Sequence, residues 1–97
     1  MNVISRSGLV DLAASKPGVL EVALGWYRVA KAAHWTCFAD VRKSFPDADL
    51  VGKALIFNIR PNRYRLITRV SFLTSEIYVK ALVTHKEYDR EEWKKWV

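Results

Sequence analysis

Two short stretches of the sequence carry side chains that could perform acid–base or phosphate chemistry. The segment "VTHKEYD", residues 83–89, places His85 close to Tyr88, which brings a proton acceptor near a phenol. The segment "RYRLITRV", residues 63–70, has the alternation of a β-strand and puts Arg63, Arg65 and Arg69 on one face. Three guanidiniums without an acidic residue among them favour a surface that binds RNA phosphates over a merely solvated face.

The distribution of charge points in the same direction. The net charge is +6; residues 1–52 carry six Lys or Arg against five Asp or Glu, whereas residues 53–97 carry ten against five. A basic half on a small domain suggests a polyanionic partner, either nucleic acid or an acidic protein, although a solvated basic surface is the plain alternative. Further cations that we expect to help bind RNA are Arg60, Lys80 and Lys86.

Other kinds of catalytic or metal site have little support. His34 and Cys37 lie three residues apart, but Cys37 is flanked by Trp35 and Phe38 and is predicted to be a small core residue. One cysteine and two histidines cannot complete a zinc site, and there is no glycine-rich phosphate loop, so no metal or cofactor is expected. The single cysteine, the absence of an apolar run of ~20 residues and the lack of a signal-like start predict a cytoplasmic protein without a membrane partner.

The elements that must position these residues form one α+β domain over residues 1–97. We expect helices to pack on one face of a small antiparallel sheet and to leave the other face free. The N-terminal part is predicted to hold a short strand in "MNVIS", a helix over 6–15, a helix from Pro17 through residue 33 with two apolar stripes, and a helix capped by Thr36 and stopped by Pro46. After a loop over 46–53, strands are predicted at 54–59, 63–70 and 75–83, joined by hairpin connections, and then a helix from His85 to about Trp96.

The start of that last helix has a structural explanation that does not need catalysis. Thr84 and Glu87 form the T-x-x-E of a capping box, and Val83 with Tyr88 matches a hydrophobic staple. His85 is then the first helical residue, where the macrodipole disfavours an imidazolium and favours the neutral, proton-accepting form. The capping role and a catalytic role are compatible.

Several blocks of the chain resemble the HigB family of toxin–antitoxin toxins: "MNVISR", "WYRVAKAAHW", "FADVRKSFPDADLVGK", "NRYRLITRV" and "VTHKEYD". The resemblance implies a compact RelE-like endoribonuclease that cleaves mRNA, typically on translating ribosomes, and is silenced by the helix-turn-helix antitoxin HigA. The family's N-x-Y-R-L-I block falls on residues 62–67 and singles out Arg65, and its T-H-x-E-Y-D block falls on residues 84–89. Relatives often have Gly-Gly where this chain has Arg60-Pro61, a departure expected to alter the binding of RNA more than the chemistry.

The expected chemistry is metal-independent attack of a ribose 2′-OH on the adjacent phosphorus. His85 is the predicted base, Arg65 and Arg69 with Lys53 are predicted to hold the phosphate, and Tyr88 is predicted to donate a proton or to orient the substrate. One alternative is a basic module that binds RNA or the ribosome and blocks translation without cleavage. Another is a structural partner protein whose two-sided second helix forms an interface.

Overall fold

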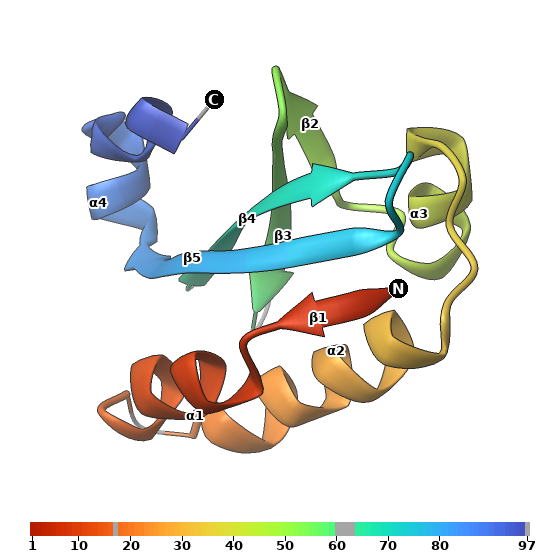
Figure 1. Ribbon diagram of the computed structural model, residues 1–97. Coiled ribbons are helices and arrows are strands. Elements are labelled where there is room, and N and C mark those ends of the chain that lie inside the picture. Colours follow the sequence, from red (N-terminus) through yellow and green to blue (C-terminus); the bar gives the residue numbers. More distant parts are fainter. Residues whose placement is uncertain (17, 60–63, 97) are drawn as a thin grey trace.

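A five-stranded sheet in the order β1-β5-β4-β3-β2 forms the centre of the protein (Figure 1). The computed structural model describes residues 1–16, 18–59 and 64–96. The strands are β1 Asn2–Ile4, β2 Asp49–Val51, β3 Ala54–Ile59, β4 Tyr64–Ser71 and β5 Glu76–Thr84. The antiparallel pairing of β3, β4 and β5 confirms the predicted meander, whereas the parallel pairing of β1 with β5 at one edge makes the sheet mixed.

Helices cover both faces of this sheet, but to different extents. They are α1 Arg6–Ala14, α2 Leu20–Ala32, α3 Phe38–Ser44 and α4 His85–Asp89, followed by the 3₁₀ helix η1 Glu92–Trp96. Helices α1 and α2 lie on one side of the sheet, and α4 with η1 lies on the other (Figure 1). This is the predicted α+β fold, with helices first, strands afterwards and a short C-terminal helix.

The main core lies between the N-terminal helices and one face of the sheet. The indole of Trp26 on α2 meets the ring of Phe57 on β3 edge-on, with centroids 5.2 Å apart. Trp26 and Ala30, which come from different predicted stripes of α2, are buried, whereas Val22 and Val29, from the stripe of Trp26, remain 40% and 43% exposed. The helix therefore packs through one face instead of two.

Several predictions for the N-terminal half were wrong in detail. Helix α2 begins at Leu20, because Gly18 has a φ of 69° and cannot continue a right-handed helix; the predicted start at residue 17 lies outside the described residues. The N-cap of α3 is Cys37, not Thr36. The backbone N–H and hydroxyl of Thr36 instead donate to the Asp40 carboxylate over 2.9 and 2.7 Å, and these bonds lower the pKa of Asp40. Cys37 is exposed at this helix start and does not enter the core.

The predicted loop 46–53 contains the edge strand β2. Its three residues pair with β3, with Asp49 opposite Ile56 and Val51 opposite Ala54, and Gly52 makes the turn at a φ of 59°. Such a short strand shows too little alternation to be recognised from sequence. Its position matters because it holds Asp49 beside Ile56 of β3, where its carboxylate affects the pKa of Tyr88.

A second, smaller core lies on the face that was predicted to be free. Trp93 of η1 is only 4% exposed and packs with Ile56 of β3 and Ile67 of β4. The expected continuous helix from His85 to Trp96 is broken, since α4 ends at Asp89 and Glu91 adopts a φ of 62°. This reversal returns the chain over the sheet and lets Trp93 cover Ile67, which the strand pattern had placed on an open face.

A bulge adjusts the pairing of the two longest strands. Ile67 lies opposite Ala81 and Thr68 lies opposite Val79, so Lys80 has no partner on β4. The extra residue keeps Val79 and Leu82 on the main core. Thr68 is completely buried and its hydroxyl donates to the Leu55 carbonyl over 2.7 Å.

Within residues 1–16, 18–59 and 64–96, no helix combines the length and apolar character that a membrane crossing requires.

Helix α4 begins with the complete predicted capping box. The Thr84 hydroxyl accepts from the Glu87 N–H over 3.1 Å, and the Thr84 N–H donates to the Glu87 carboxylate over 3.0 Å. The Thr84 N–H, and after it the Thr84 side chain, lower the pKa of the Glu87 carboxyl below its ordinary 4.5. The contribution of this carboxylate to stability is therefore present above pH 4.5 and is lost as the pH falls through its lowered pKa.

Replacing the capping hydroxyl should weaken the start of α4 measurably. We expect Thr84→Ala to lower the free energy of unfolding by about 0.5–2 kcal/mol, because the Glu87 N–H loses its acceptor. Urea unfolding measures the change. Thr74→Ala, at an exposed turn residue whose hydroxyl has no such role, is the matched control. Equal losses in the two variants would contradict the capping assignment.

Candidate active site

Three of the predicted catalytic residues meet at one end of β4. The pairing of Tyr64 with Thr84 places Arg65 beside the start of α4. The Arg65 Nη2 lies 3.3 Å from His85 Nδ1, and the Arg65 Cζ lies 5.5 Å from the centroid of the Tyr88 ring. Arg65 of β4 and two residues of α4 thus form a compact cationic cluster. The sequence had predicted such a basic strand beside a capped helix.

The contacts of His85 define where its proton resides. A guanidinium can only donate, so His85 Nδ1 must accept from Arg65 and the proton of the neutral ring is on Nε2. That Nε2 lies 3.5 Å from the Asp89 carboxylate, one helical turn later. These two neighbours decide the tautomer of the neutral ring, whereas the helix macrodipole that the sequence suggested bears only on its charge and comes from a helix of five residues. Asp89 was missed as a site residue, although its i+4 spacing from His85 was a usable signal.

Arg65 has unused hydrogen-bonding capacity inside this cluster. Its Nη1 is buried and has no partner among the residues that the structure describes. A buried charged donor that lacks an acceptor is costly, and a carboxylate or phosphate oxygen is the group that would satisfy it best. Because Nη1 is shielded from solvent, an oxyanion would satisfy it only after the guanidinium turns outward, beside His85 and Tyr88.

Tyr88 is held in an environment that keeps its phenol protonated. Its ring stacks on Trp93 with centroids 4.8 Å apart and planes 3° apart, and the indole N–H donates to the Tyr88 carbonyl over 2.9 Å. Burial raises the pKa of Tyr88, the Asp49 carboxylate raises it further, and the charge of Arg65 opposes both effects. Trp93 and Asp49 were not predicted to matter, since their roles depend on the break at Glu91 and on the unrecognised strand β2.

Lys53, the fourth predicted catalytic residue, belongs to a separate group. With Arg69, Val70, Ser71 and Tyr78 it lines a cavity of about 260 Å³ at the other end of β4. Arg69 lies four residues from Arg65, about 13 Å along a strand that advances roughly 3.3 Å per residue. The structure does not bring Lys53 to His85.

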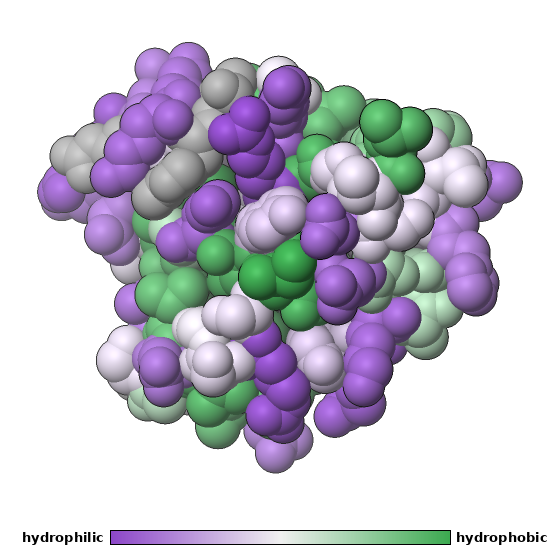
Figure 2. Space-filling model, in the orientation of Figure 1, coloured by the Kyte–Doolittle hydropathy of each residue, from purple (hydrophilic) through white to green (hydrophobic). Residues whose placement is uncertain are grey.

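The remaining predicted RNA-binding residues are distributed around these two groups. Lys80 is exposed, with its Nζ 5.6 Å above the Tyr78 ring, and so joins the group of Lys53 and Arg69. Lys86 is exposed on α4 next to His85, in a region where hydrophilic side chains gather (Figure 2). Arg60 and Arg63 lie outside the described residues.

Comparison with known proteins identifies the family to which this fold and site belong. The structure is a small α+β domain in which Arg65, His85 and Tyr88 form a cationic cluster at one end of β4. Residues 21–91 match the HigB toxin family, described as a RelE-like toxic component of a toxin–antitoxin system. The chain belongs to this family.

Curated relatives agree over nearly the whole chain. The mRNA interferase toxin HigB of Escherichia coli K12 is 31% identical over 94 residues, which cover 92% of this chain and 88% of the relative. The mRNA interferase HigB of Escherichia coli O6:H1 is 26% identical over 93 residues, or 93% of this chain and 90% of the relative. A Shigella flexneri mRNA interferase HigB is likewise 31% identical over 94 residues.

The effect of Asp49 on Tyr88 can be tested by titration. The absorbance difference between the wild type and Tyr88→Phe should titrate above pH 10.0, the ordinary value for tyrosine. We expect Asp49→Asn to lower this midpoint, because a nearby negative charge disfavours the phenolate.

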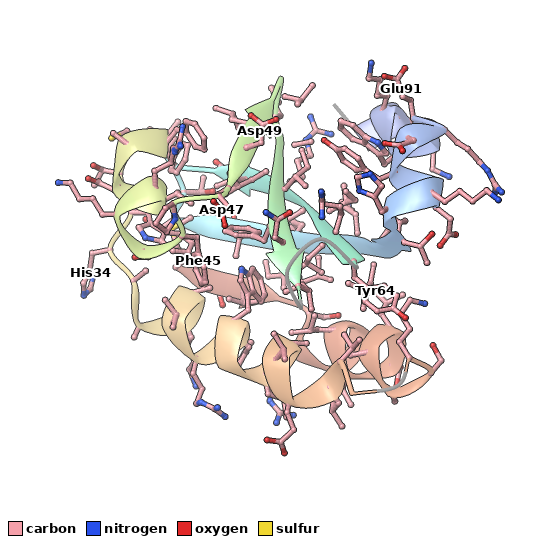
Figure 3. All side chains as sticks on the ribbon, turned by 180° about the vertical axis from the view of Figure 1, so that it is seen from behind. His34, Phe45, Asp47, Asp49, Tyr64 and Glu91 are labelled. Carbon is pink, nitrogen blue, oxygen red and sulfur yellow. The ribbon has the colours of Figure 1, made fainter. Side chains whose placement is uncertain are left out.

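Asp47 provides a matched control for this titration. It lies in the connection between α3 and β2, near Asp49 in the chain, and does not contribute to the pKa of Tyr88 (Figure 3). Asp47→Asn should leave the Tyr88 midpoint unchanged. An equal shift in both variants would indicate a general charge effect instead of the specific one.

Proposed function

We propose that the protein is an endoribonuclease toxin that cleaves mRNA by metal-independent attack of a ribose 2′-OH on the adjacent phosphate. The relatives named mRNA interferases support the substrate class. The observation that carries the proposal is Arg65, which contacts His85 and Tyr88 while its Nη1 has no acceptor among the described residues. This side chain supplies the phosphate-binding cation between the proposed base, His85, and the proposed acid, Tyr88.

In the first step of the mechanism, the Arg65 guanidinium exchanges its hydrogen bond to His85 for one to a phosphate oxygen of the substrate. In the free protein both ring nitrogens of His85 are engaged, Nδ1 by Arg65 and Nε2 by Asp89. When a phosphate oxygen binds the guanidinium, Arg65 no longer donates to Nδ1 and that lone pair becomes available. Substrate binding thereby creates the base, and Asp89 holds the ring and stabilises the imidazolium that forms.

The displacement at phosphorus comes next, with the entering 2′-oxygen in line with the leaving 5′-oxygen. His85 Nδ1 removes the 2′-OH proton while the 2′-oxygen forms a bond to phosphorus, and Arg65 stabilises the charge that develops on the phosphate oxygens. The bond from phosphorus to the 5′-oxygen breaks, and that oxygen takes a proton from the Tyr88 hydroxyl. The products are a 2′,3′-cyclic phosphate and a 5′-OH, and solvent returns the proton from His85 to Tyr88.

The partners of this function are mRNA, the translating ribosome and a helix-turn-helix antitoxin of the HigA type. Family membership supports an antitoxin, and the excess of basic residues after residue 52 suits both RNA and an acidic antitoxin segment. The proposed site has only one base and one acid. A ribosome that holds the message would supply part of the orientation of the 2′-OH and the phosphate that cleavage requires. The rival function is a non-catalytic module that blocks translation by binding.

Mapping of message ends in expressing cells separates these functions. Expression of the wild type without an antitoxin should arrest growth and create new 5′ ends carrying a hydroxyl. His85→Gln should reduce cleavage by about two orders of magnitude or more, because the base is lost. Its melting temperature should stay close to that of the wild type, since His85 is exposed and the capping bonds come from Thr84 and Glu87.

The other histidine of the chain is the control for this experiment. His34 is exposed and points away from the sheet (Figure 3), so His34→Gln should cleave at the wild-type rate. Growth arrest without new 5′ ends would favour the non-catalytic module. A folded His85→Gln protein that cuts at the wild-type rate would remove His85 from the mechanism.

Replacing Arg65 should affect both binding and chemistry. We expect Arg65→Ala to lower the cleavage rate by about 10²–10³, as for the loss of one donor to a developing oxyanion. With a 2′-O-methylated RNA, which cannot be cut, the salt dependence of binding should become shallower by roughly 0.7 of a unit, one phosphate contact. Arg28→Ala, on the exposed surface of α2 across the sheet, should change neither quantity.

A further inference from the structure

A second cationic group surrounds an aromatic ring away from the proposed catalytic site. Tyr78 of β5 lies opposite Arg69 of β4, and the two side chains line the cavity of about 260 Å³ together with Lys53. The ammonium of Lys80 stands 5.6 Å above the Tyr78 ring. Three flexible cations therefore converge on one half-buried tyrosine.

The structure points to a nucleotide subsite at Tyr78, where one base of the RNA stacks on the ring and its phosphates are bound by Lys53, Arg69 and Lys80. This inference rests on the proposed RNA substrate and adds a contact with one further nucleotide of that RNA. An aromatic ring with adjacent cations is the combination by which proteins bind single-stranded RNA without base-specific hydrogen bonds. An acidic protein segment would need the cations but not the ring.

The neighbours of the ring limit the side from which RNA can approach. Glu76, two residues earlier on β5, raises the pKa of Tyr78 through hydrogen bonding and through its charge, so its carboxylate lies close to the phenol. The carboxylate repels phosphates on that side of the ring and favours their approach on the side of Lys53 and Arg69. Lys80 occupies the ring face in the free protein, and as an exposed side chain it can exchange the ring for a phosphate when a base arrives.

The subsite lies at a useful distance from Arg65. Arg69 of the subsite and Arg65 point from the same face of β4, the face that carries α4. They are about 13 Å apart along the strand. That distance exceeds the separation of neighbouring phosphates in a single strand. The base on Tyr78 is consequently not the one next to the cleaved bond but a flanking one, and stacking there would fix the register of the message relative to His85.

Binding of RNAs with single missing bases tests the subsite. A 2′-O-methylated oligoribonucleotide, in which an abasic position is moved step by step along the chain, is titrated against the wild type, Tyr78→Phe and Tyr78→Leu. In the wild type and in Tyr78→Phe, one abasic position flanking the cleaved bond should weaken binding about 5- to 160-fold, the loss expected for one base–aromatic stack. In Tyr78→Leu the same abasic position should have no effect, because the stack is already lost.

A second variant does not depend on replacing the ring. Arg69→Gln changes an exposed side chain and should make the salt dependence of RNA binding shallower by roughly 0.7 of a unit, whereas Arg28→Gln should not. An abasic profile that is identical in Tyr78→Leu and the wild type overturns the subsite. So does a Tyr78→Leu protein that loses affinity for a HigA-type antitoxin but binds RNA unchanged.

The same measurements separate this inference from the proposed cleavage. Because the 2′-O-methylated RNA cannot be cut, a Tyr78-dependent abasic position would support the subsite even if message were not cleaved. Normal cleavage of message without any Tyr78-dependent position would leave the enzyme intact and refute the subsite.

Discussion

The pairing of Tyr64 with Thr84 is the contact on which the arrangement of the site depends. It fixes the register of β4 against β5 and so decides that Arg65, and not a neighbour, stands beside the first residue of α4. A slip of one residue would exchange the two faces of β4, burying Arg65 in the main core and exposing Leu66. The core prevents this, because Leu66 and Val70 pack with the N-terminal helices while Ile67 packs with Trp93 on the opposite face.

A one-turn helix such as α4 would not be stable alone, and two local features hold it. The capping box of Thr84 and Glu87 fixes its start, and the stack of Trp93 on Tyr88 fixes its end against the sheet. The cluster is thus supported from both sides while His85 stays exposed to a substrate. The reversal at Glu91, in a left-handed conformation unfavourable for this residue type, is what allows the tryptophan to return.

Much of the fold and part of the site could be read from the sequence because they depend on local patterns. The strands around Arg65 and Ile77 followed alternation, the strand around Ile56 was a short apolar run, and the start of α4 followed the Thr84–Glu87 spacing. The features that were missed depend on tertiary contacts. These are the parallel pairing of β1, the edge strand β2 and the fold-back of Trp93, none of which has a periodic signal. Accordingly Arg65, His85 and Tyr88 were grouped from sequence, but Lys53 and Arg69 were wrongly grouped with them and Asp49 and Trp93 were left out.

The parallel pairing of β1 with β5 affects how the protein is made. It joins Asn2 to Glu76, so the first strand to be synthesised has no partner until most of the chain exists. Folding is slowed by such distant pairings, since a long loop must close before the contact forms. The cluster around His85 is assembled later still, because it requires β5 and the segment up to Trp93. A nascent chain therefore cannot carry the complete cluster of Arg65, His85 and Tyr88 until the residues up to Trp93 have been made and folded back over the sheet.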